Sequence, residues 1–222
     1  MKKTNKKYVA FFDLDHTILE ESSGSLMWKY NIAHDIPSRK HKFYMLAAVL
    51  LGKSKLISQH TVMRIVAAMW KNVLKKDDDL YTDRVFAEVM SKHIRGDAKK
   101  EIEFHRVSGA LVLLLSASVS SICGQVKKHL NIDEALCTEL ELDGEKYTGR
   151  IKGRYCWGRE KLYRALTWCR QNGFSLEEAW YYGDAIEDRH ILAAVGHPNC
   201  VCPDQKLKEL ALKKNWKILM WR

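Results

Sequence analysis

The sequence feature that most constrains the fold is a short apolar run near the start of the chain that ends in two acids. Residues Val9–Phe12 are followed directly by Asp13, Leu14 and Asp15. A short run without polar alternation predicts a β-strand that is buried on both faces. In open α/β sheets, functional groups gather beyond the carboxyl ends of the strands. Asp13 and Asp15 are therefore either members of a catalytic site or acids that cap a turn, and partners later in the chain decide between the two.

Two further apolar runs end in polar residues in the same way. Leu111–Leu115 is followed by Ser116, and Ala179–Tyr182 is followed by Gly183 and Asp184. Helical patterns separate the three runs, and strands that alternate with helices are typical of a parallel sheet covered on both faces. The sequence thus predicts an α/β fold in which three strand ends converge.

Residues 22–95 have a different character, because they contain no pattern of a buried strand. Val62–Leu74 places apolar residues on one face of a helix, and Val85–Met90 continues the pattern in a second helix. Asp77–Asp79 separates these two helices and is a candidate start of the second, and Lys40–Leu51 predicts another helix. We expect a helical module inserted after the first strand, with helices of one continuous domain as the alternative.

The net charge of +10 comes mainly from the two ends of the chain. Residues 1–7 hold four lysines and no acid, and residues 206–222 hold five lysines and one arginine against one glutamate. The middle of the chain is close to neutral. This distribution argues against a nucleic-acid reader, which would carry a basic face on its fold, and favours solvated charge.

The cysteines and the apolar segments predict the compartment. None of the six cysteines forms a Cys-x-x-Cys pair. The apolar patch Phe43–Leu51 is shorter than the about 20 residues that a membrane span needs, and no signal-peptide pattern is visible. We therefore expect a cytoplasmic protein without a membrane span.

The acids at the strand ends predict the chemistry. Asp13, Asp184 and Asp188 would concentrate negative charge, which requires a cation, and oxygen ligands select a hard ion such as Mg²⁺. With a phosphate charge neutralised in this way, Asp13 can act as a nucleophile and form an aspartyl phosphate. Asp15 can protonate the leaving oxygen and then activate water.

A hydroxyl and a lysine complete the set. Ser116 supplies a donor and Lys161 a positive charge for the phosphoryl oxygens. Each residue has a structural alternative: Ser116 as a helix cap, Lys161 as a surface charge and Asp188 as an acid on a helix. Their joint occurrence, each at a strand end or on an adjoining helix, favours one site.

With these motifs the chain resembles the haloacid dehalogenase-like superfamily of phosphotransferases. The resemblance is to subfamily IB, the branch related to phosphoserine phosphatases and histidinol-phosphate phosphatases. The matching motifs are Phe11–Thr17, Leu113–Ser118, Gly158–Lys161 and Tyr182–Asp188. Together they are specific for the core, whereas the helical insert carries no such motif.

The resemblance implies both the architecture and the site. It implies a Rossmann-like parallel sheet core from residues 1–21 and 96–222, with residues 22–95 as an inserted helical cap domain of the C1 type. It implies Mg²⁺ held by Asp13, the backbone carbonyl of Asp15, Asp184 and Asp188. It places the phosphate against Thr17, Ser116, Ala117 and Lys161. The implied reaction is hydrolysis of a small phosphomonoester.

One position departs from the phosphoserine phosphatases. Those enzymes carry a glutamate nine residues after the nucleophile, where it receives the substrate ammonium, and this chain has Ser22 there. Glu20 and Glu21 are out of register. Relatives that share the Asp-Leu-Asp-His-Thr motif include enzymes resembling histidinol-phosphate phosphatases, which favours an amino-alcohol phosphate as substrate. Three aromatic residues, Trp28, Tyr155 and Trp157, either line the entrance or pack in the core.

Two other functions remain open. A phosphotransferase of the same fold would use the same residues and pass the phosphoryl group to an alcohol instead of water. A non-catalytic binding module could use the basic ends to contact an acidic partner, although such a module need not retain all the catalytic residues. The sequence does not define the oligomeric state.

Overall fold

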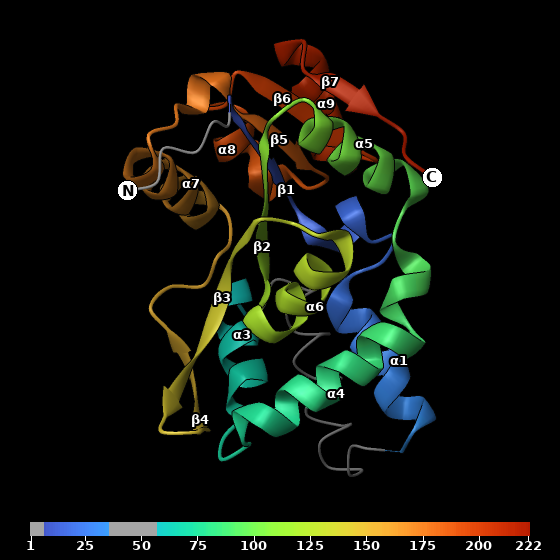
Figure 1. The fold of residues 1–222 in the computed structure, drawn as a ribbon, viewed down its shortest axis with the longest axis vertical. Coiled ribbons are helices and arrows are strands. Elements are labelled where there is room, and N and C mark those ends of the chain that lie inside the picture. The colour runs from blue at the N-terminus through green and yellow to red at the C-terminus, as the bar shows by residue number, and fades with distance from the viewer. Residues whose placement is uncertain (1–6, 36–56) are drawn as a thin grey trace.

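The computed structural model describes residues 7–35 and 57–222 (Figure 1). In these residues one seven-stranded sheet has the order β4-β3-β2-β1-β5-β6-β7. Every neighbouring pair is parallel except β3 and β4, which form an antiparallel hairpin. The strands are β1 (Val9–Phe12), β2 (Leu111–Val119), β3 (Glu134–Asp143), β4 (Lys146–Lys152), β5 (Trp180–Gly183), β6 (His197–Val201) and β7 (Lys217–Leu219).

Helices connect the parallel strands and cover both faces of the sheet. The α-helices are α1 (Ser23–Ala33), α3 (Gln59–Ala68), α4 (Lys75–Glu88), α5 (Gly96–Val107), α6 (Ser120–Leu130), α7 (Arg159–Asn172), α8 (Arg189–Leu192) and α9 (Gln205–Lys214). Short turns of other helix types are η1 (Leu14–Ile18), η2 (Met90–His93), η3 (Leu176–Glu178) and η4 (Ile186–Asp188). The predicted α/β fold with a parallel sheet is confirmed. The helix expected over residues 40–51 lies outside the described residues.

The central strand β1 is buried on both faces, as its apolar run predicted. Successive side chains of a strand point to opposite faces. Accordingly, Ala10 and Phe12 belong to the core that α5 and α6 complete. Val9 and Phe11 belong to a second core, completed by α7, α8 and α9. Two separate apolar cores therefore hold β1 between layers of helices and fix the position of its carboxyl end.

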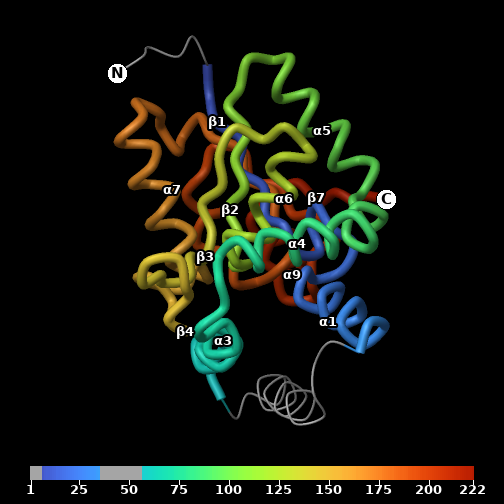
Figure 2. The backbone as a smooth tube through the Cα atoms, turned by 60° about the horizontal axis from the view of Figure 1, so that its bottom comes forward, coloured from blue at the N-terminus to red at the C-terminus, as the bar shows by residue number. Residues whose placement is uncertain are grey.

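Helices α1, α3 and α4 lie together away from most of the sheet, at the lower end of the view in Figure 1. Helix α4 packs against α6, and α3 packs against β4. The hairpin of β3 and β4 runs down beside α3 in both views (Figures 1 and 2). The division into a core and a cap of residues 22–95 remains a prediction, with this hairpin bridging the two.

One predicted boundary in the helical segment was wrong and another was confirmed. The helix expected over Val62–Leu74 ends at Ala68, because the backbone N–H of Asn72 donates to the Tyr147 carbonyl and that of Tyr147 donates to the Val73 carbonyl. Pairing with the hairpin thus overrides the helical period. The acids Asp77–Asp79 lie near the start of α4, the second of the two helices, as predicted, and negative charge stabilises a helix N-terminus.

None of the helices in residues 7–35 and 57–222 is long and apolar enough to cross a membrane.

Candidate active site

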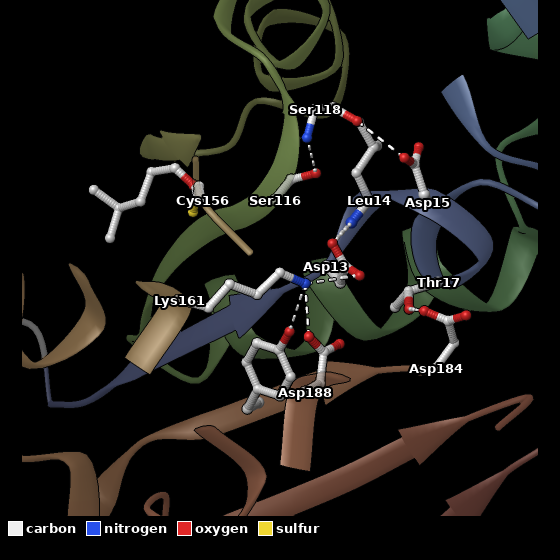
Figure 3. Close-up of polar contacts among 12 residues, drawn as sticks. Asp13, Leu14, Asp15, Thr17, Ser116, Ser118, Cys156, Lys161, Asp184 and Asp188 are labelled. Carbon is white, nitrogen blue, oxygen red and sulfur yellow. Dashed lines mark hydrogen bonds and ion pairs between the residues drawn. The ribbon is translucent and has the colours of Figure 1, made fainter. Parts of the chain in front are cut away.

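Asp13 lies at the carboxyl end of β1, at the centre of the site (Figure 3). Its backbone N–H donates to the Tyr182 carbonyl of β5 at 2.9 Å, which ties it to the neighbouring strand. Its Oδ1 accepts a hydrogen bond from the Leu14 N–H at 2.7 Å, and its Oδ2 lies 2.9 Å from the Lys161 Nζ. Both carboxylate oxygens are therefore held in fixed directions.

Lys161 connects the carboxylates. It lies in the first turn of α7, and its Nζ is 2.8 Å from Asp188 Oδ1 and donates to the Tyr181 hydroxyl at 3.1 Å. Burial alone would lower the pKa of this ammonium, but the charges of Asp13 and Asp188 outweigh burial and raise the pKa well above its ordinary value. Lys161 is therefore a permanent positive charge inside the site.

Three carboxylates converge beside this lysine. Asp13, Asp184 and Asp188 each offer an oxygen, and these oxygens lie within 4.8 Å of one another. Burial is the main cause that raises the pKa of Asp13 to about 7 and that of Asp184 to about 8; the neighbouring acids raise both pKa values further, and Lys161 opposes the rise. The charged forms of these acids are therefore costly without an additional cation.

The donor set fits a hard divalent ion. Asp188 Oδ2 is buried and has no hydrogen-bond partner among the described residues, and an orphaned carboxylate oxygen beside other carboxylates is a natural ligand for Mg²⁺. Gly183 makes this placement possible, since a Cβ at that residue would lie 2.3 Å from Asp188 Oδ2. Glycine at position 183 thus leaves room beside β5 for the Asp188 carboxylate.

The Asp15 side chain is held apart from this cluster. Its Oδ1 accepts from the backbone N–H of Ser23 at 2.7 Å, and its Oδ2 accepts from the Ser118 hydroxyl at 3.0 Å. The chain turns sharply here, because His16 adopts the left-handed conformation with φ of 58°. The Asp15 side chain therefore lies at the junction of β2 and α1, apart from the three clustered carboxylates.

The remaining predicted residues surround Asp13. Ser116 is buried, and its hydroxyl accepts from the Ser118 N–H at 3.1 Å. The Ala117 carbonyl accepts from the Thr138 hydroxyl at 2.7 Å. The buried Thr17 hydroxyl donates to Asp184 Oδ1 at 3.5 Å. The structure thus brings every predicted site residue to one edge of the sheet, where β1, β2 and β5 end.

Sequence reasoning assigned no role to several residues of the site. Ser118 and Ser23 orient Asp15, and their hydroxyl oxygens lie 2.8 Å apart. The predicted strand ended at Leu115, whereas β2 continues to Val119. The pairing of β2 with β3 shifts register between Ser116 and Val119, so regular alternation along the apolar run did not predict where Ser118 lies. Ser23 gave no signal, because only folding brings it to Ser118.

Ser22, which stands where phosphoserine phosphatases have a glutamate, has a structural role. Its side chain accepts from the Ser25 N–H at 3.2 Å and caps the start of α1. Glu21 lies 2.6 Å from Lys29 in an ion pair, and Glu20 lies 3.9 Å from His93. Neither glutamate replaces the missing acid, so the described site has no carboxylate in the phosphoserine phosphatase register.

Comparison with known proteins agrees with this geometry. The model of the haloacid dehalogenase-like hydrolase family matches residues 10–193. A probable phosphatase of Mycobacterium tuberculosis is 29% identical over 222 residues, covering 95% of this chain and 74% of its own length. A histidinol-phosphatase of Neisseria meningitidis serogroup C is 24% identical and covers 97% of this chain and 100% of its own length.

Solved structures share the fold. A protein of unknown function from Bordetella pertussis Tohama I has a TM-score of 0.89 at 20% identity, over 97% of this chain and 99% of that chain. A substrate-bound phosphoserine phosphatase has a TM-score of 0.70 at 16% identity, over 97% of this chain and 93% of that chain. The chain therefore belongs to the haloacid dehalogenase-like hydrolase family, as a phosphatase.

Proposed function

We propose that this phosphatase is a Mg²⁺-dependent hydrolase of small phosphomonoesters that works through an aspartyl phosphate on Asp13. The observation that carries the proposal is the cluster of Asp13 and Asp188, which are buried, and Asp184, which is half-buried, beside Lys161. It combines an oriented carboxylate nucleophile with a fixed cation and an all-oxygen donor set. These are the parts that phosphoryl transfer requires.

The ion would be held by the side chains of Asp13, Asp184 and Asp188, together with the backbone carbonyl of Asp15. When bound, Mg²⁺ would neutralise the carboxylates and the substrate phosphate, so that the two can approach. Lys161 would remain beside Asp13 and stabilise charge on the transferring phosphoryl group. The Ser116 and Thr17 hydroxyls and the Ala117 backbone would orient its oxygens.

The chain's own carboxylates would carry both halves of the reaction. A carboxylate oxygen of Asp13 attacks the phosphorus, and the bond from phosphorus to the alcohol oxygen breaks. Asp15 gives its proton to that oxygen, and the alcohol leaves. Water then attacks the phosphorus of the aspartyl phosphate while Asp15 takes its proton. Inorganic phosphate and the free carboxylate of Asp13 result.

The test is release of inorganic phosphate from p-nitrophenyl phosphate and a panel of phosphomonoesters, with Mg²⁺ or with EDTA. We expect Mg²⁺-dependent release that falls at least about a thousandfold in Asp13→Asn, because the nucleophile is lost. Asp143→Asn is the matched control, since Asp143 is exposed on the hairpin. Release by Asp13→Asn at the rate of the control would contradict the mechanism, and equal release in EDTA would contradict the role of the ion.

A further inference from the structure

A large cavity lies between α3 and the segment that leads from β4 into α7. Its volume is about 1170 Å³, slightly above the roughly 300–1,000 Å³ of common small-molecule sites. Helix α3 contributes His60 and Arg64 to the lining. Strand β4 contributes Arg150, the segment after β4 contributes Arg154, and the start of α7 contributes Arg159. Four arginines from different elements thus meet around one opening.

Two of these arginines form ion pairs with acids. Arg150 lies 2.7 Å from Glu141, and Arg154 lies 3.9 Å from Glu160. Glu160 is shared, because Arg164 lies 3.4 Å from it on the same helix.

The other two arginines carry uncompensated charge. In the part of the chain that the structure describes, neither Arg64 nor Arg159 has an acidic side chain within ion-pair distance, and both are exposed at the cavity rim. Residues 1–6 and 36–56 contain no Asp or Glu, so they supply no acid either. The cavity therefore presents two free guanidinium groups to whatever enters it.

The cavity wall is aromatic and adjoins the catalytic cluster. His60 contacts Tyr155 and Trp157 edge-on, with ring centroids 5.5 and 6.0 Å apart. Tyr155 also adjoins the site through its neighbour in sequence. The Thr138 hydroxyl accepts from the Cys156 N–H at 3.2 Å and donates to the Ala117 carbonyl at 2.7 Å, so hydrogen bonds join the cavity wall to β2 beside Ser116. The first turn of α7 also connects the two places, because Lys161 contacts Asp13 and Arg159 lines the cavity. One ligand could therefore contact both.

Building on the proposed phosphatase function, we propose that this cavity binds a second phosphate group of the substrate. The substrate class is then a small molecule with two phosphate groups, one placed at Asp13 and the other at Arg64 and Arg159. A guanidinium group offers a planar fork of donors that matches phosphate oxygens. The same charges repel an ammonium group, so the cavity favours a bisphosphate over the amino-alcohol phosphate expected from the first motif.

The test compares alkanediol bisphosphates of increasing chain length with alkyl monophosphates, ω-carboxyalkyl phosphates and ω-aminoalkyl phosphates of matched length. We expect kcat/KM for the best bisphosphate to exceed that of its monophosphate by about tenfold to a hundredfold, which is what one or two charge-assisted hydrogen bonds provide. Arg64→Gln and Arg159→Gln should each reduce that ratio. Arg84→Gln on α4 and Arg170→Gln on α7 should leave it unchanged, since both are exposed and neither lines the cavity.

Calorimetric binding to Asp13→Asn separates this inference from the proposed function. If the bisphosphate binds more tightly than the monophosphate and Arg159→Gln removes the difference, the second-phosphate site stands even if no compound is turned over. Equal binding of the two would overturn it while leaving the phosphatase proposal intact. A preference for the ω-amino or the ω-carboxy compounds would also overturn it, and the preferred group would name the true second substituent.

Discussion

His105 is a buried residue outside the catalytic cluster whose protonation the fold controls. The Tyr182 hydroxyl donates to Glu101 at 2.6 Å, so its oxygen is left to accept from the Nε2–H of His105 at 2.8 Å. The Nδ1 must then accept from the Tyr8 hydroxyl at 3.0 Å. A neutral imidazole satisfies all of these bonds, whereas a second ring proton would remove the acceptor of Tyr8.

This environment predicts a pH dependence of stability. Burial, assisted by the nearby His197, lowers the pKa of His105 to about 4, while the unfolded residue keeps a pKa of about 6.5. Between these values the unfolded state binds more protons, so the free energy of unfolding falls as the pH falls from 6.5 towards 4, by at most about 1.4 kcal/mol per pH unit. Urea unfolding of wild type and His105→Phe across this range measures the contribution.

The variant should lose less stability on acidification than the wild type does, because it has no imidazole to protonate on unfolding. His129→Gln is the control, since His129 is exposed on α6, and it should follow the wild type. Parallel curves for wild type and His105→Phe would show that His105 does not take up a proton on unfolding in this range.

At the scale of residues, the sequence predicted the position of candidate site residues that directly follow a buried strand. Asp13 and Asp184 belong to this group, because an apolar run and the polar residue after it define a strand end. Ser116 follows an apolar run in the same way, although β2 continues past it to Val119. The groups that orient Asp15 were not predicted. Ser23 and Ser118 are 95 positions apart, and their contact depends on where α1 begins relative to β2.

At the scale of elements, the hairpin of β3 and β4 is docked onto the turn between α3 and α4. Leu74 pairs with Lys146 as an isolated antiparallel bridge. Gly149 adopts φ of +80°, and a Cβ there would lie 2.9 Å from the Lys71 Cβ. Glycine is therefore required at this position both for its backbone conformation and for the close approach of the α3–α4 turn.

We predict that Gly149→Ala destabilises the protein more than Gly144→Ala does. Both glycines have a positive φ, but a Cβ at Gly144 would meet nothing within 4 Å. The strain of a left-handed alanine is therefore common to both, about 1–2 kcal/mol, and only Gly149→Ala must also displace the turn at Lys71. The difference in free energy of unfolding between the two variants, from urea titrations, should be about 1–3 kcal/mol.

Equal loss of stability in the two variants would mean that the hairpin does not rest on the α3–α4 turn in solution. The same contact explains why the end of α3 was predicted incorrectly. Apolar periodicity continues past Ala68 in the sequence, but backbone hydrogen bonds to the hairpin stop the helix. Local periodicity predicts which elements exist, and contacts distant in sequence decide where they end.

At the scale of the whole molecule, the chain passes between the sheet and the helical segment at two adjacent crossings. Leu19 pairs with Ile94, and the backbone N–H of Arg95 donates to the Ile18 carbonyl at 2.9 Å. These crossings coincide with the boundaries at residues 21 and 96 that we propose for the cap. The composition change predicted a helical segment over residues 22–95, and its status as a separate cap stays a prediction. Nothing in the composition predicted that the β3–β4 hairpin would also reach the helices.

A bound ion would also change the stability of the whole molecule, because it offsets the repulsion between carboxylates held close together. Asp184 lies among the acids of the cluster, and Lys161 is the cation that contacts Asp13 and Asp188 there. We predict that in EDTA Asp184→Asn unfolds at a higher temperature than the wild type. With a pKa raised to about 8, Asp184 must take up a proton on folding or keep its charge beside Asp13 and Asp188, and asparagine does neither. In Mg²⁺ the order should reverse, because only the wild type gains the free energy of binding, about 2.7 kcal/mol at a hundredfold excess over Kd.

Thermal unfolding of both proteins and of Asp143→Asn, with EDTA and with Mg²⁺, measures this reversal of the unfolding temperatures. Asp143→Asn should follow the wild type, and an equal Mg²⁺ shift in Asp184→Asn would place the ion elsewhere.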